Sequence, residues 1–171
     1  RVNLAATRVL LDIVGPERSS VERLPAVKRA SSAQSWLTLH GRLHHSSATA
    51  ITRASDFSIF VRERNRVSIA GFPTKFGESL ALGTPVITNM TSDLGDMFED
   101  GRNGFACPDA TVPSVQATLQ RALDQTSEGM IRMRRQARAT AESWFDLRAY
   151  AESLAELVVA SGASGVRTDI Q

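Results

Sequence analysis

The sequence predicts an α/β domain with a doubly wound parallel sheet, covered by helices on both faces. Short apolar runs alternate along the chain with segments that have helical features. The runs are continuously apolar, which is typical of strands buried on both faces of a sheet. The chain has 171 residues, 42% of them hydrophobic. A chain of this size can bury one core without disulfides or a structural metal.

The first half of the chain contains three apolar runs, and each predicts a strand. They cover residues 9–14, 36–41 and 56–61. Gly15 and Pro16 close the first run, and the polar, Ser-rich segment that follows predicts a loop as far as Gln34. Hydroxyl groups at residues 46–47 predict the start of a short helix, because Ser and Thr commonly cap helix starts.

Proline and glycine divide the second half of the chain into helices and strands. After a charged loop, Pro73 predicts the first turn of a helix and Gly83 predicts its end. Two further strands are predicted at residues 84–89 and 104–107. Beyond Pro113 the hydrophobic pattern predicts two or three amphipathic helices.

The C-terminal region predicts one more buried helix face and a tail. Leu154, Leu157 and Val158 are spaced for one face of a helix. We therefore expect a nucleotide-sugar-binding domain over residues 1–160 and a flexible tail over residues 161–171. An Arg at position 1 in place of Met suggests a processed or excised piece of a longer protein.

Composition disfavours several classes of function. Cys107 is the one cysteine, so we expect a small buried apolar group in a reducing cytoplasm. The 20 basic and 18 acidic residues are scattered, which disfavours a nucleic-acid surface. No apolar run approaches the ~20 residues that span a bilayer. We therefore expect a soluble domain without a transmembrane segment.

The most informative segment is the predicted helix that starts at Pro73. Ligands of such sheets bind beyond the carboxyl ends of the strands, and this helix start follows one of them. Because Pro lacks an N–H, the amides of Thr74, Lys75 and Phe76 are expected to be unpaired. Free amides, the helix dipole and the charge of Lys75 together favour a phosphate.

Glu78 lies one turn further into the same helix, on the same face as Thr74. A carboxylate beside a phosphate needs another partner, and one carboxylate can accept two hydrogen bonds from a vicinal diol. Phosphate and diol together describe a nucleotide. The alternative interpretation is a helix whose Glu merely complements the dipole, since acidic first turns are common.

Several blocks of the chain resemble a known family. Gly71, Phe72, Glu78 and the run at residues 79–87 look like the Glu-x7-Glu region of GT-B glycosyltransferases. They are closest to the large retaining family 4 (glycosyl transferases group 1) of polysaccharide biosynthesis. Further blocks appear in the order of its C-terminal, donor-binding domain, at residues 11–15, 39–41, 54–57 and 100–105. The resemblance covers nearly the whole chain and implies a Rossmann-like fold, the C-terminal half of a GT-B enzyme.

The resemblance also implies roles for particular residues. Glu78 matches the second Glu of the motif, which holds the ribose hydroxyls in the family. The amides that follow Gly71 and Phe72 match those that face the diphosphate. Three loop residues match the segment that borders the base: Gly41, Arg42 and Leu43.

The chain departs from the family in two places. Ala70 stands eight residues before Glu78, where the family has the first Glu, which contacts the donor hexose. The family's opening strand and its basic phosphate contacts are also missing. Lys75 and Arg62 are the nearest substitutes for those contacts. Arg62 is equally well interpreted as a solvated charge among charged neighbours.

Histidines and late aromatic residues offer further candidates. His40, His44 and His45 do not predict a metal site, because no carboxylate or cysteine nearby completes a ligand set. Trp144 and Phe145 precede the last helix and are expected to pack rather than to stack on a ligand.

Together these features predict the donor half of a retaining glycosyltransferase of polysaccharide or glycoconjugate biosynthesis. It would move a sugar from a nucleotide diphosphate sugar to an acceptor hydroxyl, without a cofactor or metal. The acceptor-binding N-terminal domain is missing, so we expect the fragment alone to be inactive, with peripheral membrane contact only through that domain. The alternative is a non-catalytic nucleotide-binding or regulatory module, which Ala70 favours. A dinucleotide oxidoreductase is disfavoured, because residues 15–18 lack a Gly-x-Gly-x-x-Gly turn.

Overall fold

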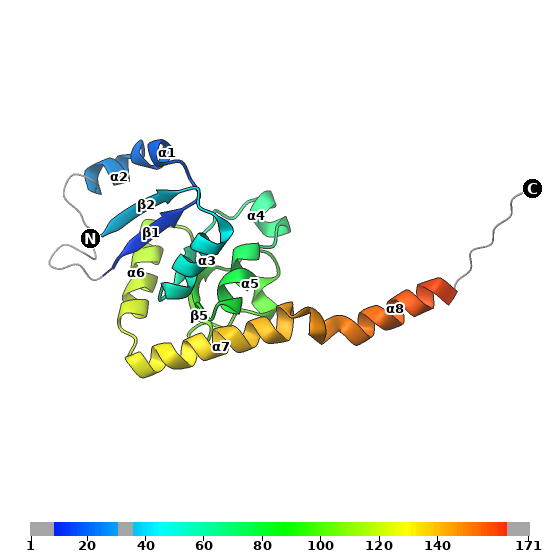
Figure 1. The fold of residues 1–171 in the computed structure, drawn as a ribbon. Coiled ribbons are helices and arrows are strands. Elements are labelled where there is room, and N and C mark those ends of the chain that lie inside the picture. The colour runs from blue at the N-terminus through cyan, green and yellow to red at the C-terminus, as the bar shows by residue number, and fades with distance from the viewer. Residues whose placement is uncertain (1–8, 31–35, 164–171) are drawn as a thin grey trace, which may run out of the picture.

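The computed structural model describes residues 9–30 and 36–163 (Figure 1). In chain order the elements are β1 (Leu11–Val14), α1 (Arg18–Glu22), α2 (Pro25–Ala30), β2 (Leu37–Gly41), α3 (His45–Ala54), β3 (Ser58–Phe60), α4 (Arg66–Ala70), α5 (Thr74–Ala81), β4 (Val86–Asn89), η1 (Ser92–Asp96), β5 (Gly104–Cys107), α6 (Val112–Leu123), α7 (Ser127–Phe145), η2 (Leu147–Tyr150) and α8 (Ala151–Ala163). All five predicted strands are present, and the α/β class is confirmed.

The strands are parallel throughout, but they form two sheets rather than one. β1 pairs with β2, with Leu11 opposite Leu37. The second sheet has the order β3-β4-β5. A cavity of about 990 Å³ lies between the sheets and is lined by residues of both β1 and β3. In the described residues no ladder joins β1 to β3, so the expectation of one continuous sheet is corrected to two.

Helices cover both faces of the three-stranded sheet, as a doubly wound arrangement requires. Adjacent residues of a strand point to opposite faces, and in β4 both Val86 and Ile87 are fully buried. Val86 packs with Phe76 of α5 and with residues of α7. Ile87 packs with Phe105, Cys107 and partly buried residues of α6. Cys107 is thus a buried apolar group, as predicted.

Two segments that the sequence predicted as loops contain short helices. The Ser-rich stretch after β1 holds α1 and α2, and the charged stretch after β3 holds α4. A capping box starts α4: the Ser68 N–H donates to Asn65 Oδ1 at 3.0 Å, and the Asn65 N–H donates to Ser68 Oγ at 2.9 Å. Helices of five or six residues depend on such local bonds rather than on an amphipathic repeat.

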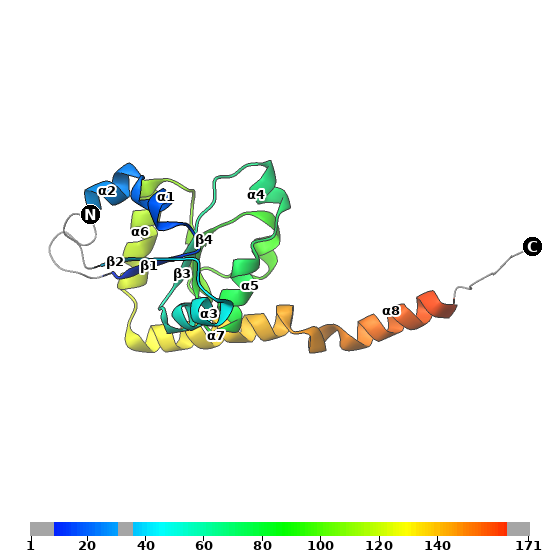
Figure 2. The ribbon, with the colours of Figure 1, turned by 45° about the horizontal axis from the view of Figure 1, so that its top comes forward.

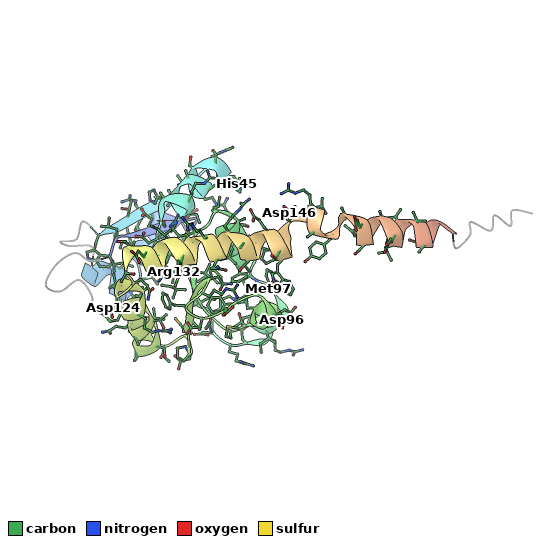
Figure 3. All side chains as sticks on the ribbon, turned by 90° about the horizontal axis from the view of Figure 1, so that it is seen from below. His45, Asp96, Met97, Asp124, Arg132 and Asp146 are labelled. Carbon is green, nitrogen blue, oxygen red and sulfur yellow. The ribbon has the colours of Figure 1, made fainter. Side chains whose placement is uncertain are left out.

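α7 runs beneath the molecule and binds the ends of two other helices. Seen from below, it crosses the body between the side marked by His45 and the side marked by Met97 (Figure 3). The Arg134 guanidinium donates to the carbonyls of Arg53 and Ser55 at the end of α3, both at 2.8 Å. Arg138 donates to the carbonyl of Ala81 at the end of α5. These cations satisfy carbonyls that a helix end leaves unpaired.

α8 differs from its predicted role. It extends away from the rest of the molecule in both views (Figures 1 and 2). Leu154, Leu157 and Val158 are 45%, 65% and 69% exposed, so the prediction of a buried face is wrong for the described chain. The helix continues to Ala163, and the rest of the predicted tail lies outside the described residues. None of the described helices is both long and apolar enough to span a membrane.

Candidate functional site

The candidate site is the cavity between the two sheets, which α3 and α5 both line. The two helices lie side by side in Figures 1 and 2. Lys75 and Glu78 of α5 line the cavity, together with His45 and Thr49 of α3 and Asp12 of β1. A cavity with apolar walls and a few convergent polar groups has the general character of a small-molecule site.

The start of α5 offers two free amides rather than the predicted three. Pro73 is the N-cap residue, and the helix begins at Thr74. The Phe76 N–H donates to the Pro73 carbonyl at 2.8 Å, so Phe76 was wrongly predicted to have a free amide. Its side chain is fully buried. The amides of Thr74 and Lys75 have no acceptor among the described residues and remain available to an anion.

Lys75 and Glu78 are bound to each other in this structure. Lys75 Nζ donates to Glu78 Oε2 at 2.6 Å, and the two side chains are 72% and 47% exposed. An exposed ion pair of this kind is worth about 0.2–1 kcal/mol. A phosphate for Lys75 and a diol for Glu78 would replace it with stronger, charge-assisted bonds. The two side chains can therefore exchange partners at small cost.

Arg62 is not a solvated charge, so that one of its two predicted interpretations is wrong. It follows β3 and is only partly exposed. Its Nη1 donates to the carbonyl of Gly71 at 3.0 Å, and its Nη2 donates to Thr91 Oγ1 at 2.6 Å. Arg62 does not line the cavity. Its guanidinium is bound instead to the loop that leads into α5.

The predicted base-binding loop follows β2 and leads into α3. Gly41 has a φ of +67°, a left-handed conformation that glycine adopts without strain. His44 caps α3, because its Nδ1 accepts from the Ser46 N–H at 3.4 Å. Gly41, Arg42 and Leu43 do not line the cavity, although α3, which they precede, does.

An aromatic cluster supports the start of α5 from below. The ring of Phe72 lies 6.3 Å from that of Phe76 and 5.9 Å from that of Phe145. A Cβ at Gly77 would lie 3.3 Å from the Phe145 ring, so the packing there is close. Phe145 packs against Phe72 and Phe76, as expected, although it is 37% exposed; Trp144 is 43% exposed.

Sequence reasoning missed the pair of Asp12 and His40. His40 Nε2 donates to Asp12 Oδ1 at 2.7 Å. The register of β1 and β2 shifts between Ile13 and Val14, opposite His40, and such irregularities redirect side chains. A carboxylate in an otherwise apolar run was the signal in the sequence that could have indicated a partner for Asp12.

Comparisons with known proteins identify the family. The sequence profile described as "Glycosyl transferases group 1" matches residues 2–125. The chain belongs to this family. It is 25% identical over 121 residues to the glycogen synthase of Mycobacterium tuberculosis, which covers 71% of this chain and 28% of that protein. The chain thus matches about a quarter of the length of that relative.

Solved structures show the same fold. HepE from Anabaena, in complex with UDP and glucose, gives a TM-score of 0.70 at 17% identity over 89% of this chain and 41% of that one. Sucrose-phosphate synthase from Thermosynechococcus elongatus gives 0.67 at 18% identity over 91% and 39%. The expected family and fold, the C-terminal half of a GT-B glycosyltransferase of group 1, are therefore confirmed.

Proposed function

We propose that this domain binds the nucleoside diphosphate part of a nucleotide sugar at the start of α5. The observation that carries the proposal is that Lys75 and Glu78 line one cavity, at a helix start where the amides of Thr74 and Lys75 have no acceptor among the described residues. The amides of Thr74 and Lys75, with the Lys75 ammonium, would hold the diphosphate. Glu78 would accept hydrogen bonds from both hydroxyls of the ribose.

UDP is the nucleotide to test first. HepE, which has this fold, has been solved with UDP-glucose, and this supports a uridine nucleotide here. We place the base beside the loop Gly41, Arg42 and Leu43, because this loop leads into α3, which borders the same cavity.

In the reaction we propose, the sugar passes to an acceptor hydroxyl with retention of configuration, in polysaccharide or glycoconjugate synthesis in the cytoplasm. Negative charge builds up on the departing diphosphate, and the amides of α5 and Lys75 would offset it. Glu78 would fix the nucleoside so that the reacting bond is positioned. The acceptor and any general base would come from the other half of the enzyme, so the domain alone would not transfer sugar.

A regulatory nucleotide-binding module is the second candidate, and Ala70 favours it. Ala70 ends α4 directly before the loop into α5, and its methyl group cannot hold a hexose hydroxyl. Such a module would bind the nucleotide without distinguishing sugars.

Calorimetric titration of the 171-residue chain with UDP, UDP-glucose, ADP-glucose and NAD tests the proposal. We expect UDP and UDP-sugars to bind and NAD not to bind. Tighter binding of one UDP-sugar than of UDP would favour the transferase, whereas equal binding of all UDP compounds would favour the regulatory module. Absence of binding by every nucleotide would refute both.

A further inference from the structure

Arg62 joins three segments of the chain at the carboxyl ends of β3 and β4. Its main-chain N–H donates to Asn89 Oδ1 at 2.9 Å, and its carbonyl accepts from Asn89 Nδ2 at 2.7 Å. The Asn89 side chain thereby binds the main chain two residues beyond Phe60, where the β3–β4 pairing ends. Both polar groups of the Arg62 main chain are therefore hydrogen-bonded, as those of a paired strand residue are.

The guanidinium of Arg62 contacts only neutral acceptors. They are the Gly71 carbonyl and Thr91 Oγ1. No carboxylate of the described residues lies within 4.0 Å of it, and its buried Nε has no partner there. A partly buried cation without a counter-ion is costly, so a purely stabilising role does not account for it. Its rigid planar fork is well suited to hold two acceptors at a fixed separation.

The position of the Gly71 carbonyl affects the position of the start of α5, because the loop between them is short. Gly71 is the C-cap residue that follows α4, and its N–H donates to the Val67 carbonyl at 2.8 Å. Only Phe72 and Pro73 separate it from the free amide of Thr74. Phe72 holds the loop from one side through its contacts with Phe76 and Phe145. Arg62 holds it from the other.

We propose that Arg62 is a positioning residue: by binding the Gly71 carbonyl, with Thr91 as its second anchor, it aims the amides of Thr74 and Lys75 at the diphosphate. This rests on the proposed function for the ligand, but the anchoring of the loop does not. Arg62 itself does not touch the nucleotide. A misplacement of the amides by an ångström is enough to cost a large factor in binding or rate.

Three variants test the proposal: Arg62→Lys, Arg62→Met and Thr91→Val. Arg64→Met is the control, because Arg64 is an exposed cation two residues away. The first readout is hydrogen exchange of the ligand-free protein. The amides of Gly71 and Phe76 are hydrogen-bonded within the loop and the first turn of α5. We expect both to exchange faster in all three variants and to be unchanged in the control.

The second readout compares the affinity for UDP with that for uridine. We expect Arg62→Lys and Arg62→Met each to weaken UDP about tenfold or more and uridine less than about twofold. A single ammonium cannot reproduce the two-pronged contact. Thr91→Val should weaken UDP less, and its effect should disappear when Arg62 is already Met.

Two results would overturn the proposal. If Arg62→Lys retains the affinity for UDP and Thr91→Val leaves it unchanged, Arg62 is a direct phosphate ligand. If the Gly71 and Phe76 amides exchange at the wild-type rate in all variants, Arg62 does not hold the loop. Should the wild-type protein fail to bind UDP, the proposed function fails, while the exchange rates still decide whether Arg62 anchors the loop.

Discussion

Replacing Glu78 by Gln separates a ribose-binding carboxylate from a surface residue that only complements the helix dipole. The substitution keeps the shape of the side chain and removes its charge. In the ligand-free protein it removes the ion pair between Glu78 and Lys75. The side chains of Lys75 and Glu78 are 72% and 47% exposed. In the nucleotide complex it removes the charge assistance of two hydrogen bonds to the ribose.

The two effects have opposite signs, and the structure sets their sizes. Loss of the ribose contacts should cost about 1.4–2.8 kcal/mol, a ten- to hundredfold loss of affinity. Release of Lys75 toward the diphosphate returns at most about 1 kcal/mol, because the pair is exposed. UDP should therefore bind more weakly to Glu78→Gln. 2′,3′-Dideoxy-UDP, which lacks the diol, should bind equally well or up to about fivefold more tightly.

The assay is calorimetric titration of wild type and Glu78→Gln with both nucleotides, arranged as a thermodynamic cycle. The release of Lys75 is common to both ligands and cancels, so the coupling energy reports the diol alone. Glu99→Gln is a matched control, because Glu99 forms an exposed i,i+3 pair with Arg102 at the same 2.6 Å. A coupling energy near zero, with both nucleotides bound, would refute the assignment of Glu78 to the ribose.

Three further predictions concern charge, acid stability and packing. Lys75→Ala should weaken UDP by about 1.5–3 kcal/mol and leave uridine unchanged; equal losses by calorimetry would contradict a phosphate contact. Burial raises the pKa of Asp100, but the hydrogen bonds from Arg121 and the Ala106 N–H, together with the charge of Arg121, outweigh burial, and the pKa is lowered. Asp100→Asn should therefore lower the Tm at pH 7, and the difference should vanish as the pH falls below the usual carboxyl range; a constant difference would refute this. A Cβ at Gly104 would lie 2.0 Å from the Val86 carbonyl, so Gly104→Ala should cost more than ~2 kcal/mol in urea unfolding. An unchanged midpoint would show that the strands can move apart.

The strands could be predicted because each one corresponds to a short apolar run of consecutive residues. Residues 104–107 were predicted with the observed bounds, since a short and mostly buried apolar run in a sheet is recognisable by composition. The strand predicted at residues 56–61 is longer than β3 at both ends, because only Ser58–Phe60 pairs with β4. The apolar spacing in α8 likewise predicted that the apolar residues there share one face of a helix. The spacing alone could not show whether another element covers that face.

The residues of the candidate site that belong to one helix start could be predicted from the sequence. The residue whose role depends on contacts between distant segments could not. Lys75 and Glu78 follow from the chemistry at the start of α5, and both line the cavity. The role of Arg62 depends on Gly71 and Thr91, 9 and 29 residues further along. Those contacts exist only in the folded chain. The sequence alone therefore could not distinguish a structural role for Arg62 from that of a solvated surface charge.

The division of the strands into two sheets bears on how the molecule unfolds. β1 and β2 share no ladder with β3, β4 and β5 in the described chain, so strand hydrogen bonds do not couple the two parts. Local opening of weakly coupled parts lowers cooperativity, and the β1–β2 part, which ends in the proposed base-binding loop, should open at lower urea concentration. Trp36 lies beside β2 and Trp144 in α7, so variants with a single tryptophan give each part its own fluorescence signal. Coincident midpoints for the two signals would show that the helices alone make the molecule unfold as one unit.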